Sequence, residues 1–376
     1  MNIAILGAGN GGLAMAGQLS LQGHTVNLFD KFEEAILPLK ESRRIEVKGV
    51  ISGSAALNRV TSHIGEAIEY CSFIIVITPA FAHRDIAENI SAYLKDGQIV
   101  LLHPGRTGGA IEFRHILKKR NVSKKVTVAE TQTLLYASRR TGSTEVTIYG
   151  IKKKVSIAAL PSIETENVVH VINQALPYFI PARNILFTSL HNIGAIFHPT
   201  PTLLNIGRIE TENHDFDYYH QGITPSIAKI LDRIDQERIA VARAYKVDVP
   251  SAQEWLYEAY EVQGASLWES IQRNKTYSGI LAPNSVNVRY ISEDVPMSLV
   301  PISSLGKVAG IPTPSIDAVI ELTSALHDVD YRKEGRNLDA LGLDQTMESI
   351  LNIVGESNQN ILGKREDKQG DCITVK

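Results

Sequence analysis

The stretch that decides the fold stands at the N-terminus and reads Ile3-Ala4-Ile5-Leu6-Gly7-Ala8-Gly9-Asn10-Gly11-Gly12-Leu13-Ala14-Met15-Ala16. An apolar run, a G-x-G-x-x-G turn and an alanine-rich segment follow one another as strand, turn and helix. In such a motif Gly7 allows the tight turn, Gly9 lets the backbone approach a pyrophosphate, and Gly12 lets the helix pack on the strand. The helix N-terminus also attracts phosphates. We therefore predict a dinucleotide site formed by Gly7, Ala8, Gly9, Asn10, Gly11 and Gly12.

An acidic residue follows at the distance that this motif requires. After a helix stop at Gln22-Gly23-His24, a second strand over Thr25–Phe29 ends at Asp30. Asp30 lies about 20 residues beyond the glycines, where a carboxylate binds ribose hydroxyls. An acid there repels a 2′-phosphate, whereas the neighbouring Lys31 attracts one. The cofactor is therefore NAD or NADP, and NAD is slightly favoured.

Composition bounds the class of protein. A chain of 376 residues is long enough for two domains, and 44% hydrophobic with 21% charged residues is typical of a globular protein. The net charge of −3 gives no reason to expect nucleic acid or an anionic membrane as a partner. We find neither a membrane-spanning run nor a signal peptide pattern. Cys71 and Cys372 are expected to be free thiols, metal-ligand spacings are absent, and we expect a cytoplasmic protein.

Strands and helices alternate through the first half of the chain, which predicts a doubly wound parallel sheet. Further strands are expected over Ser72–Ile77, Gln98–Leu102 and Val126–Glu130. Ligands of such sheets bind at the carboxyl ends of the strands. The residues that follow these strands are therefore expected to line the cofactor cleft: Thr78 and Pro79, Pro104 and Gly105, and Glu130 to Gln132.

The pattern becomes helical near Ile185. Before it, strands are expected over 144–149 and 155–159 and helices over 82–94 and 164–174; after it, helices are expected over 225–245, over 250–260 and from Pro314. The predicted fold class is α/β, an N-terminal Rossmann-type sheet followed by an all-α domain. We assign residues 1–185 to dinucleotide binding and residues 186–360 to a helical catalytic domain. Residues 361–376 are charged and are expected to be disordered.

Two histidines could supply acid–base chemistry in the second domain. His198 precedes Pro199, which disfavours a helical backbone at His198 and ends the apolar helix expected over 192–197. A histidine at a helix end can project into a cleft, and the helix dipole favours its protonated form. His191 is the weaker candidate, because a lone histidine on an apolar segment is more often a core residue.

A second polar group combines one guanidinium with two carboxylates, in the stretch Arg289-Tyr290-Ile291-Ser292-Glu293-Asp294. Arg289 could bind a substrate carboxylate with its planar fork. Asp294 could orient and charge a histidine. From these residues alone, a surface ion pair among Arg289, Glu293 and Asp294 is at least as good an interpretation.

Several separate stretches resemble one family, the opine dehydrogenases of the octopine/nopaline group. Besides the glycine loop they are Thr78-Pro79-Ala80, Pro104 to Gly109, Glu130 to Leu134 with Tyr136 and Arg139, His191-Asn192 through His198-Pro199, and Arg289-Tyr290 with Glu293 to Pro296. They run in the family's order over most of the chain. The resemblance implies a Rossmann domain and a helical domain with the active site between them.

The resemblance also implies a reaction and roles for its residues. Family members use NAD(P)H to join an amino acid to a 2-oxo acid such as pyruvate, through an imine, into a secondary-amine dicarboxylate. His198 resembles the family's catalytic histidine, Asp294 the aspartate paired with it, and Arg289 an arginine that contacts substrate. Thr78 and Pro79 are expected near the nicotinamide ribose. The substrates' identity is not implied, and a homodimer is compatible with the apolar helical domain.

Two alternatives remain from other classes. A ketone reductase of the ketopantoate reductase or glycerol-3-phosphate dehydrogenase type would share the two-domain plan. Those families use a lysine early in the helical domain, whereas the stretch from Leu186 to Ala228 contains none. A non-catalytic NAD-binding sensor would keep the glycine loop and Asp30 but would need neither His198 nor Asp294.

Overall fold

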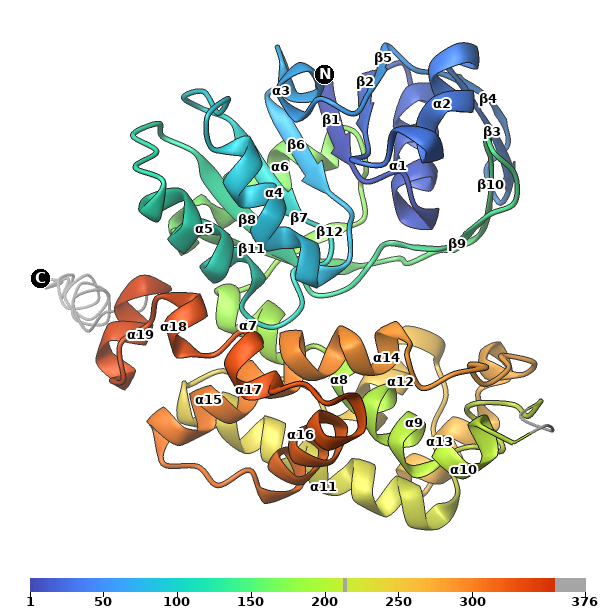
Figure 1. Cartoon of the computed structure of the whole chain (residues 1–376), viewed down its shortest axis with the longest axis vertical. Coiled ribbons are helices and arrows are strands. Elements are labelled where there is room, and N and C mark those ends of the chain that lie inside the picture. Colours follow the sequence, from blue (N-terminus) through green and yellow to red (C-terminus); the bar gives the residue numbers. More distant parts are fainter. Residues whose placement is uncertain (212–214, 356–376) are drawn as a thin grey trace, which may run out of the picture.

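The apolar runs of the N-terminal half pair into one sheet in the computed structural model, which describes residues 1–211 and 215–355. The strand order is β12-β11-β8-β7-β6-β1-β2-β5 (Figure 1). The strands are β1 Asn2–Leu6, β2 Thr25–Phe29, β5 Arg59–Thr61, β6 Phe73–Val76, β7 Ile99–Leu102, β8 Thr127–Thr131, β11 Val155–Leu160 and β12 Phe179–Pro181. Neighbours are parallel, as predicted, except that β11 runs antiparallel to β8.

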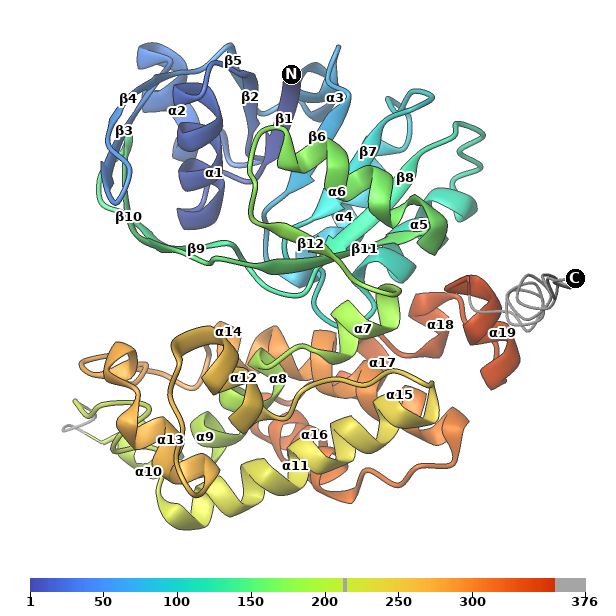
Figure 2. The same ribbon diagram turned by 180° about the vertical axis from the view of Figure 1, so that it is seen from behind.

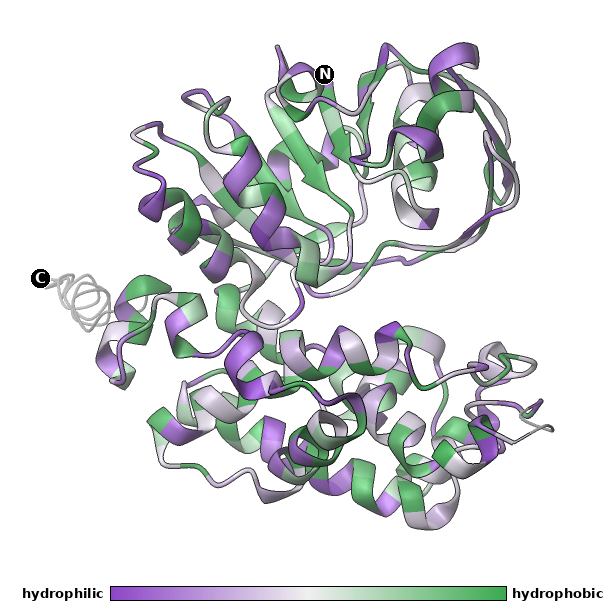
Figure 3. Ribbon diagram, in the orientation of Figure 1, coloured by the Kyte–Doolittle hydropathy of each residue, from purple (hydrophilic) through white to green (hydrophobic). Residues whose placement is uncertain are grey.

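Both faces of this sheet are buried. Successive strand residues point to opposite sides of a sheet, so each strand contributes to two cores. In β1, Ile3 and Ile5 belong to one apolar core, whereas Ala4 and Leu6 belong to another. The central strands are therefore apolar throughout (Figure 3), as strands covered on both faces must be. The covering helices are α1 Asn10–Leu21, α2 Glu33–Ser42, α3 Ile64–Ile68, α4 His83–Ile90, α5 Gly109–Lys119 and α6 Thr165–Asn173, with the short 3-10 helices η1 Ala80–Ala82 and η2 Ser162–Glu164.

A second sheet, which the sequence analysis did not predict, has the order β4-β3-β10-β9. Its strands are β3 Arg44–Gly49, β4 Gly53–Ala56, β9 Tyr136–Arg140 and β10 Glu145–Ile151. The strand predicted over 144–149 is thus real but belongs here and not to the doubly wound sheet. This sheet packs against α1 on the side away from the large sheet (Figures 1 and 2). Helix α1 therefore lies between two sheets, which explains why it carries no polar face.

The second half of the chain is helical from Ile185 onward, as far as it is described. One isolated bridge joins Asp217 to Leu281. The helices are α7 Ile185–Leu190, α8 Gly194–Phe197, α9 Pro199–Leu204, α10 Ile206–Ile209, α11 Pro225–Ala244, α12 Ala252–Tyr260, α13 Leu267–Arg273, η3 Lys275–Tyr277, α14 Arg289–Ser292, η4 Val295–Leu299 (a π-helix), α15 Val300–Ala309, α16 Pro314–His327, α17 Tyr331–Glu334, α18 Leu338–Leu341 and α19 Met347–Ile353.

Local signals explain where these helices begin. The Thr224 side chain accepts a hydrogen bond from Ile227 N at the start of α11, and Ser251 forms a capping box with Glu254 at the start of α12. The helix predicted over 82–94 is shorter than expected, because a 3-10 turn precedes α4 and α4 ends at Ile90. The predicted tail over 361–376 lies outside the described residues.

The chain returns to the first lobe near its end. Helix α18 packs on α5, and Arg336, just before it, has no exposed surface. Its guanidinium donates hydrogen bonds to Glu112 (2.7 Å), to the carbonyl oxygen of Gly105 (2.9 Å) and to that of Ala80 (3.0 Å). A buried arginine is stable only when paired in this way. Arg336 therefore ties the C-terminal helices to the loops that follow β6 and β7.

Candidate active site

The glycine loop has the geometry that its sequence predicts. Gly7 has φ +116°, and a Cβ there would lie 2.3 Å from the carbonyl oxygen of Ile77. A Cβ at Gly12 would lie 1.8 Å from the carbonyl oxygen of Gly7, so only glycine lets α1 begin so close to β1. A Cβ at Gly9, by contrast, would meet nothing within 4 Å. Space is therefore open where a pyrophosphate must approach the backbone.

Asp30 directly follows β2 and is hydrogen-bonded to the glycine loop. Its Oδ2 accepts a hydrogen bond from the backbone N–H of Ala8 at 2.8 Å, and its Oδ1 accepts one from the N–H of Phe32 at 3.1 Å. Asn10, the first residue of α1, accepts through Oδ1 a hydrogen bond from the N–H of Arg140, so β9 lies beside the loop. Gly11 is buried against Leu134.

A cavity of about 1240 Å³ begins at this loop. It extends between the ends of β1, β2 and β6, and four predicted cofactor residues line it: Gly7, Asp30, Thr78 and Pro79. The hydroxyl of Thr78 is buried and has no hydrogen-bond partner among the described residues, so it could still bond a ligand. The open space at Gly9, the Asp30 carboxylate and this cavity together fit a dinucleotide.

Other residues expected along this cleft prove to be structural. Glu130 is fully buried; its carboxylate accepts hydrogen bonds from the N–H of Ala110 and from the hydroxyls of Thr188 and Ser189. Burial raises its pKa, and these hydrogen bonds counteract the rise only in part. The expectation that Glu130 lines the cleft is therefore wrong: it joins β8 to α7 because its strand end lies under the helical lobe.

The two predicted catalytic residues meet although they lie far apart in the chain. His198 ends α8 as predicted, but its backbone stays in the helical region (φ −106°, ψ −61°), contrary to the effect expected of Pro199, which begins α9. Asp294 immediately precedes the π-helix η4. His198 Nδ1 lies 2.8 Å from Asp294 Oδ2. The histidine side chain is 21% exposed and that of the aspartate only 1%. With Nδ1 held by the carboxylate, Nε2 has no hydrogen-bond partner among residues 1–211 and 215–355 and is the atom that could face a substrate.

Arg106, which the sequence analysis did not select, supports Asp294 from the other lobe. Its Nη1 lies 3.1 Å from Asp294 Oδ1, the oxygen that does not face His198. Burial alone raises the pKa of Asp294, but the charges of Arg106 and His198 outweigh burial and hold that pKa below its usual value. Asp294 therefore stays ionised although it is buried.

Arg106 takes this position in a left-handed backbone conformation, with φ +59°. Such a conformation costs a residue with a Cβ about 1–2 kcal/mol, which marks a position under functional or structural demand. Its place in Pro104-Gly105-Arg106-Thr107 was a usable signal, since this loop follows β7 at the ligand edge of the sheet. Sequence reasoning did not identify Asp294 as its partner, because they come from different lobes.

Arg289 lies beside the pair but is engaged by another carboxylate. Its Nε and Nη2 lie 2.6 and 2.5 Å from Glu293 Oε2. Glu293 in turn accepts a hydrogen bond through Oε1 from the N–H of Ala80 at 3.0 Å, directly after Thr78 and Pro79. The guanidinium of Arg289 is 60% exposed, so part of its fork stays open. Of the ion pair expected among Arg289, Glu293 and Asp294, the structure forms the contact between Arg289 and Glu293. Asp294 instead contacts Arg106 and His198.

Aromatic side chains lie next to His198. Tyr290 stacks on His198 with ring centroids 4.4 Å apart. Tyr218 is fully buried, and its hydroxyl donates to the backbone oxygen of His198 at 2.8 Å, so it fixes the backbone of the histidine. Tyr219 stacks on Tyr277. The rings therefore hold the imidazole plane in place.

His191 differs from His198 in every respect that matters for catalysis. Its side chain is buried, and neither ring nitrogen has a hydrogen-bond partner among the described residues. Burial lowers its pKa to about 3. The ring packs edge-on against Phe187. His191 therefore stays neutral at physiological pH and acts as a core residue.

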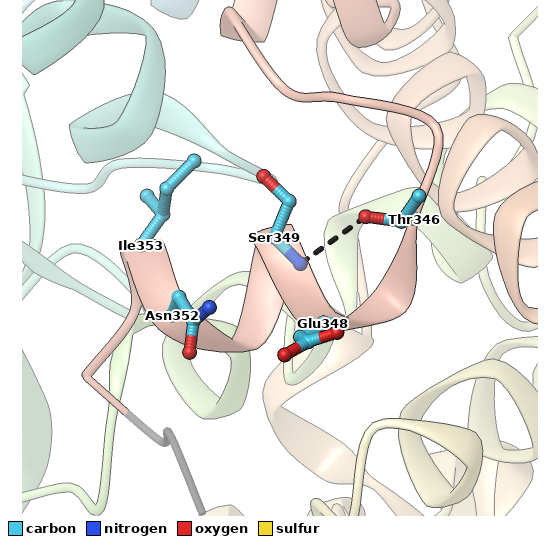
Figure 4. Close-up of a pocket in the computed structure, with 5 residues that line it drawn as sticks. All are labelled: Thr346, Glu348, Ser349, Asn352 and Ile353. Carbon is cyan, nitrogen blue, oxygen red and sulfur yellow. Dashed lines mark hydrogen bonds between the residues drawn. The ribbon is translucent and has the colours of Figure 1, made fainter.

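A second hollow lies on α19 (Figure 4), in the C-terminal segment that returns to the first lobe. It is lined by Thr346, Glu348, Ser349, Asn352 and Ile353. The Thr346 hydroxyl accepts the N–H of Ser349 there, which is a helix cap. The residues that line this second hollow include none of the predicted site residues.

Comparison with known proteins gives the family. A model described as the α-helical domain of NAD/NADP octopine/nopaline dehydrogenase matches residues 181–327. An opine dehydrogenase of Arthrobacter sp. (strain 1C) is 42% identical over 341 residues, which cover 90% of this chain and 94% of that one. The chain belongs to the opine dehydrogenase family. The resemblance inferred from the motifs is thereby confirmed, and the chain is an NAD(P)-dependent oxidoreductase.

Solved structures confirm the fold of the family. Octopine dehydrogenase in complex with NADH and agmatine has a TM-score of 0.80 at 20% identity, over 95% of this chain and 99% of that one. Yersinopine dehydrogenase with NADP+ bound has a TM-score of 0.73 at 14% identity, over 94% and 97%. Residues 2–110, which lie in the first lobe, also match the N-terminus of NAD-dependent glycerol-3-phosphate dehydrogenase. Across the described residues, none of the helices could cross a bilayer.

Proposed function

We propose that this chain joins an amino acid to a 2-oxo acid and reduces the resulting imine to a secondary amine. In the reverse direction it oxidises the CH–NH bond of that amine. The observation that carries the proposal is the His198–Asp294 pair at 2.8 Å beside the cofactor cavity. The pair and the cavity are neighbours because Glu293, the residue before Asp294, accepts a hydrogen bond from the N–H of Ala80. Ala80 lies two residues beyond Thr78, which lines the cavity.

His198 is the acid–base residue in this proposal. Its Nδ1 faces Asp294, so the proton transferred to or from substrate sits on Nε2. Condensation needs a proton delivered to the oxygen of the 2-oxo acid, which leaves as water when the imine forms. Asp294 holds the ring in one orientation through Nδ1. Because Arg106 keeps Asp294 ionised, this support persists although the carboxylate is buried.

The cofactor is held by the loop of Gly7, Ala8, Gly9, Asn10, Gly11 and Gly12, by Asp30, and by Thr78 and Pro79. NAD(P)H supplies the hydride when bound. The N–H groups at the start of α1 take the pyrophosphate, and Asp30 takes the ribose hydroxyls. Thr78 and Pro79, at the end of β6, hold the nicotinamide ribose next to the His198 pair.

Arg289 binds the carboxylate of the 2-oxo acid in this proposal. Glu293 orients its guanidinium through Nε and Nη2, and the exposed remainder can form a forked contact with a carboxylate. Such a contact turns the oxo carbon toward the cofactor while its oxygen faces His198.

We further propose that NADH is preferred to NADPH. A 2′-phosphate would meet the carboxylate of Asp30. The nearest cation in sequence, Lys31, lies 3.5 Å from Asp85, so a carboxylate already competes for its charge. This ion pair weakens the support that Lys31 lends to NADP.

A panel assay tests the reaction. The wild-type protein is mixed with NADH, pyruvate and one of a set of L-amino acids, and NADH absorbance is followed. Amino-acid-dependent oxidation is expected. Oxidation with the oxo acid alone supports a ketone reductase instead, and NADH binding without turnover in any pair supports a sensor.

His198→Ala sharpens the same assay. Loss of the proton donor is expected to lower kcat by about 10²–10⁴-fold, while the dissociation constant for NADH, measured by protein fluorescence, stays unchanged. His191→Ala is the matched control, since it removes an imidazole from the same segment, and is expected to retain turnover. Unchanged kcat in His198→Ala would remove this residue from the mechanism.

A further inference from the structure

Strand β9 presents an arginine that the mechanism above does not use. Its residues alternate between two sides. On one side, Tyr136 is buried and donates to Gln18 of α1, Ser138 donates to the carbonyl oxygen of Asn10, and Arg140 donates to the carbonyl oxygen of Ala8. By this alternation the Arg139 side chain points away from α1. The side chain is exposed and forms neither a hydrogen bond nor an ion pair with any residue that the structure describes, whereas the backbone pairs with Thr147 of β10.

The strand that carries Arg139 lies at the boundary with the helical lobe. Strand β9 runs along the edge of the first lobe opposite α14 (Figures 1 and 2). The charge of Arg139 reaches Tyr290 of α14: burial raises the pKa of Tyr290, and Arg139 acts against that rise. Tyr290 is the ring stacked on His198. Arg139 thus lies on the strand opposite α14, and its charge acts on the ring that stacks on His198.

The charges around this cleft leave Arg139 unpaired. Arg106 is held by Asp294, Lys31 lies beside Asp85, and Arg140 is saturated by backbone carbonyl oxygens of Ala8, Ala35, Gly142 and Ser143. Arg289 offers one open fork. The proposed product carries two carboxylates, one from each substrate, so a second cation is required if both are to be neutralised.

We propose that Arg139 binds the carboxylate of the amino-acid substrate. His198 decides which arginine binds which carboxylate. Its proton goes to the oxygen of the oxo acid, and this places the oxo acid on the Arg289 side. The remaining carboxylate then faces β9. This inference rests on the proposed reaction and adds that each lobe contributes one carboxylate receptor.

Arg139→Gln and Arg139→Lys test the assignment with pyruvate, NADH and three pairs of amines: L-arginine with agmatine, L-leucine with 3-methylbutylamine, and L-phenylalanine with phenethylamine. For the amino acids that the wild type uses, Arg139→Gln is expected to lower kcat/KM by about 10–100-fold, the effect of losing a charged hydrogen-bonded pair. KM for pyruvate and for NADH should change less than about twofold. Arg139→Lys should recover part of the loss, because it keeps the charge but not the fork.

The amines give a second readout, since each lacks only the carboxylate. Where the wild type turns over an amine, Arg139→Gln should leave its kcat/KM within about twofold. Arg114→Gln, which removes an exposed arginine from α5 away from the cleft, is the control and should leave all constants unchanged.

Three outcomes overturn the inference: an unchanged kcat/KM for amino acids, a selective rise in KM for NADH, which assigns Arg139 to the cofactor, or a selective rise in KM for pyruvate, which assigns it to the oxo acid. Failure of the proposed reaction is separate, because it shows in the wild type as an absence of amino-acid-dependent NADH oxidation.

Discussion

The cofactor loop and the catalytic pair are built in opposite ways. Gly7, Gly12 and Asp30 lie within one strand–turn–helix–strand unit, and the contacts that shape the loop are made inside it. His198 and Asp294 are separated by 96 positions, and Arg106 joins them from the other lobe. The comparison teaches that a binding loop can be carried by local sequence, whereas an ionised, buried carboxylate needs the whole tertiary structure. Changes at the two places should therefore have different signatures.

Asp294→Asn is expected to have the largest effect. The amide keeps the shape of the carboxylate but removes the negative charge that faces His198 Nδ1 and fixes the orientation of the ring. We expect kcat to fall by about 10²–10⁴-fold, while NADH affinity measured by fluorescence titration is retained. A parallel loss of NADH affinity would show that the two regions are not separable.

Arg106→Gln should have the next largest effect, about 10–100-fold on kcat/KM, and should also change its pH dependence. Arg106 lowers the pKa of Asp294, so without it that pKa rises. Asp294 then takes up its proton at a higher pH, and the acid side of the profile of kcat/KM moves upward in pH. A profile that keeps its shape would contradict this role.

The same charge pair links stability to pH. The pKa of Asp294 is lower in the folded protein than its usual value, so the pair contributes to the free energy of unfolding above the unfolded pKa. That contribution is lost as the pH falls through the folded pKa. Urea unfolding of Arg106→Gln and wild type should therefore differ more at neutral than at acidic pH.

Asp30→Asn tests the local region and should have a smaller effect. Removing the negative charge should raise the ratio of kcat/KM for NADPH over NADH by about tenfold, equal to about 1.4 kcal/mol, with His198 chemistry intact. Lys31→Ala is the matched control and should change the ratio little, because Asp85 already shares its charge. A larger effect of Lys31→Ala than of Asp30→Asn would reverse the assignment.

His191→Leu should have the smallest effect on activity, none within error, and it sharpens the contrast with His198. Because burial lowers the pKa of His191 to about 3, the unfolded chain binds a proton there between pH 6.5 and 3 while the folded chain does not. This lowers the free energy of unfolding by about 2 kcal/mol at pH 5 relative to pH 7. In His191→Leu that part of the pH dependence, measured by urea unfolding, should disappear.

Sequence alone predicts the parts of the molecule in which neighbours in the chain are neighbours in space. The strands from Asn2 to Leu6 and from Thr25 to Phe29, the turn between them and the capped helix α11 follow from apolar runs, glycines and Thr224. The second sheet was missed although Ile45 and Val47 are buried and Arg44, Glu46 and Lys48 are exposed. This alternation is a strand signal, and its neighbour β4 follows directly, but its other partner β10 comes much later in the chain.

The catalytic site divides in the same way. His198 was found because Pro199 ends its helix, and Asp294 was found with the help of a family resemblance. The Arg289–Glu293 ion pair was considered from the sequence because the two residues are four positions apart, whereas the pairing of Arg106 with Asp294 could not be found, because it depends on how the two lobes meet. Glu130 was misplaced for the same reason: nothing local shows that Thr188 and Ser189 cover it.

The buried guanidinium of Arg336 has a mechanical consequence. The two lobes are joined covalently at the passage from β12 to α7, and again where the chain crosses back after α17. The Arg336 side chain fastens the returning segment to the loops of Ala80 and Gly105, and its backbone N–H donates to the carbonyl oxygen of Pro296 in the helical lobe, so that segment is bound to both lobes. Any swing between the lobes must therefore flex both crossings at once, which confines it to rotation about the line through them.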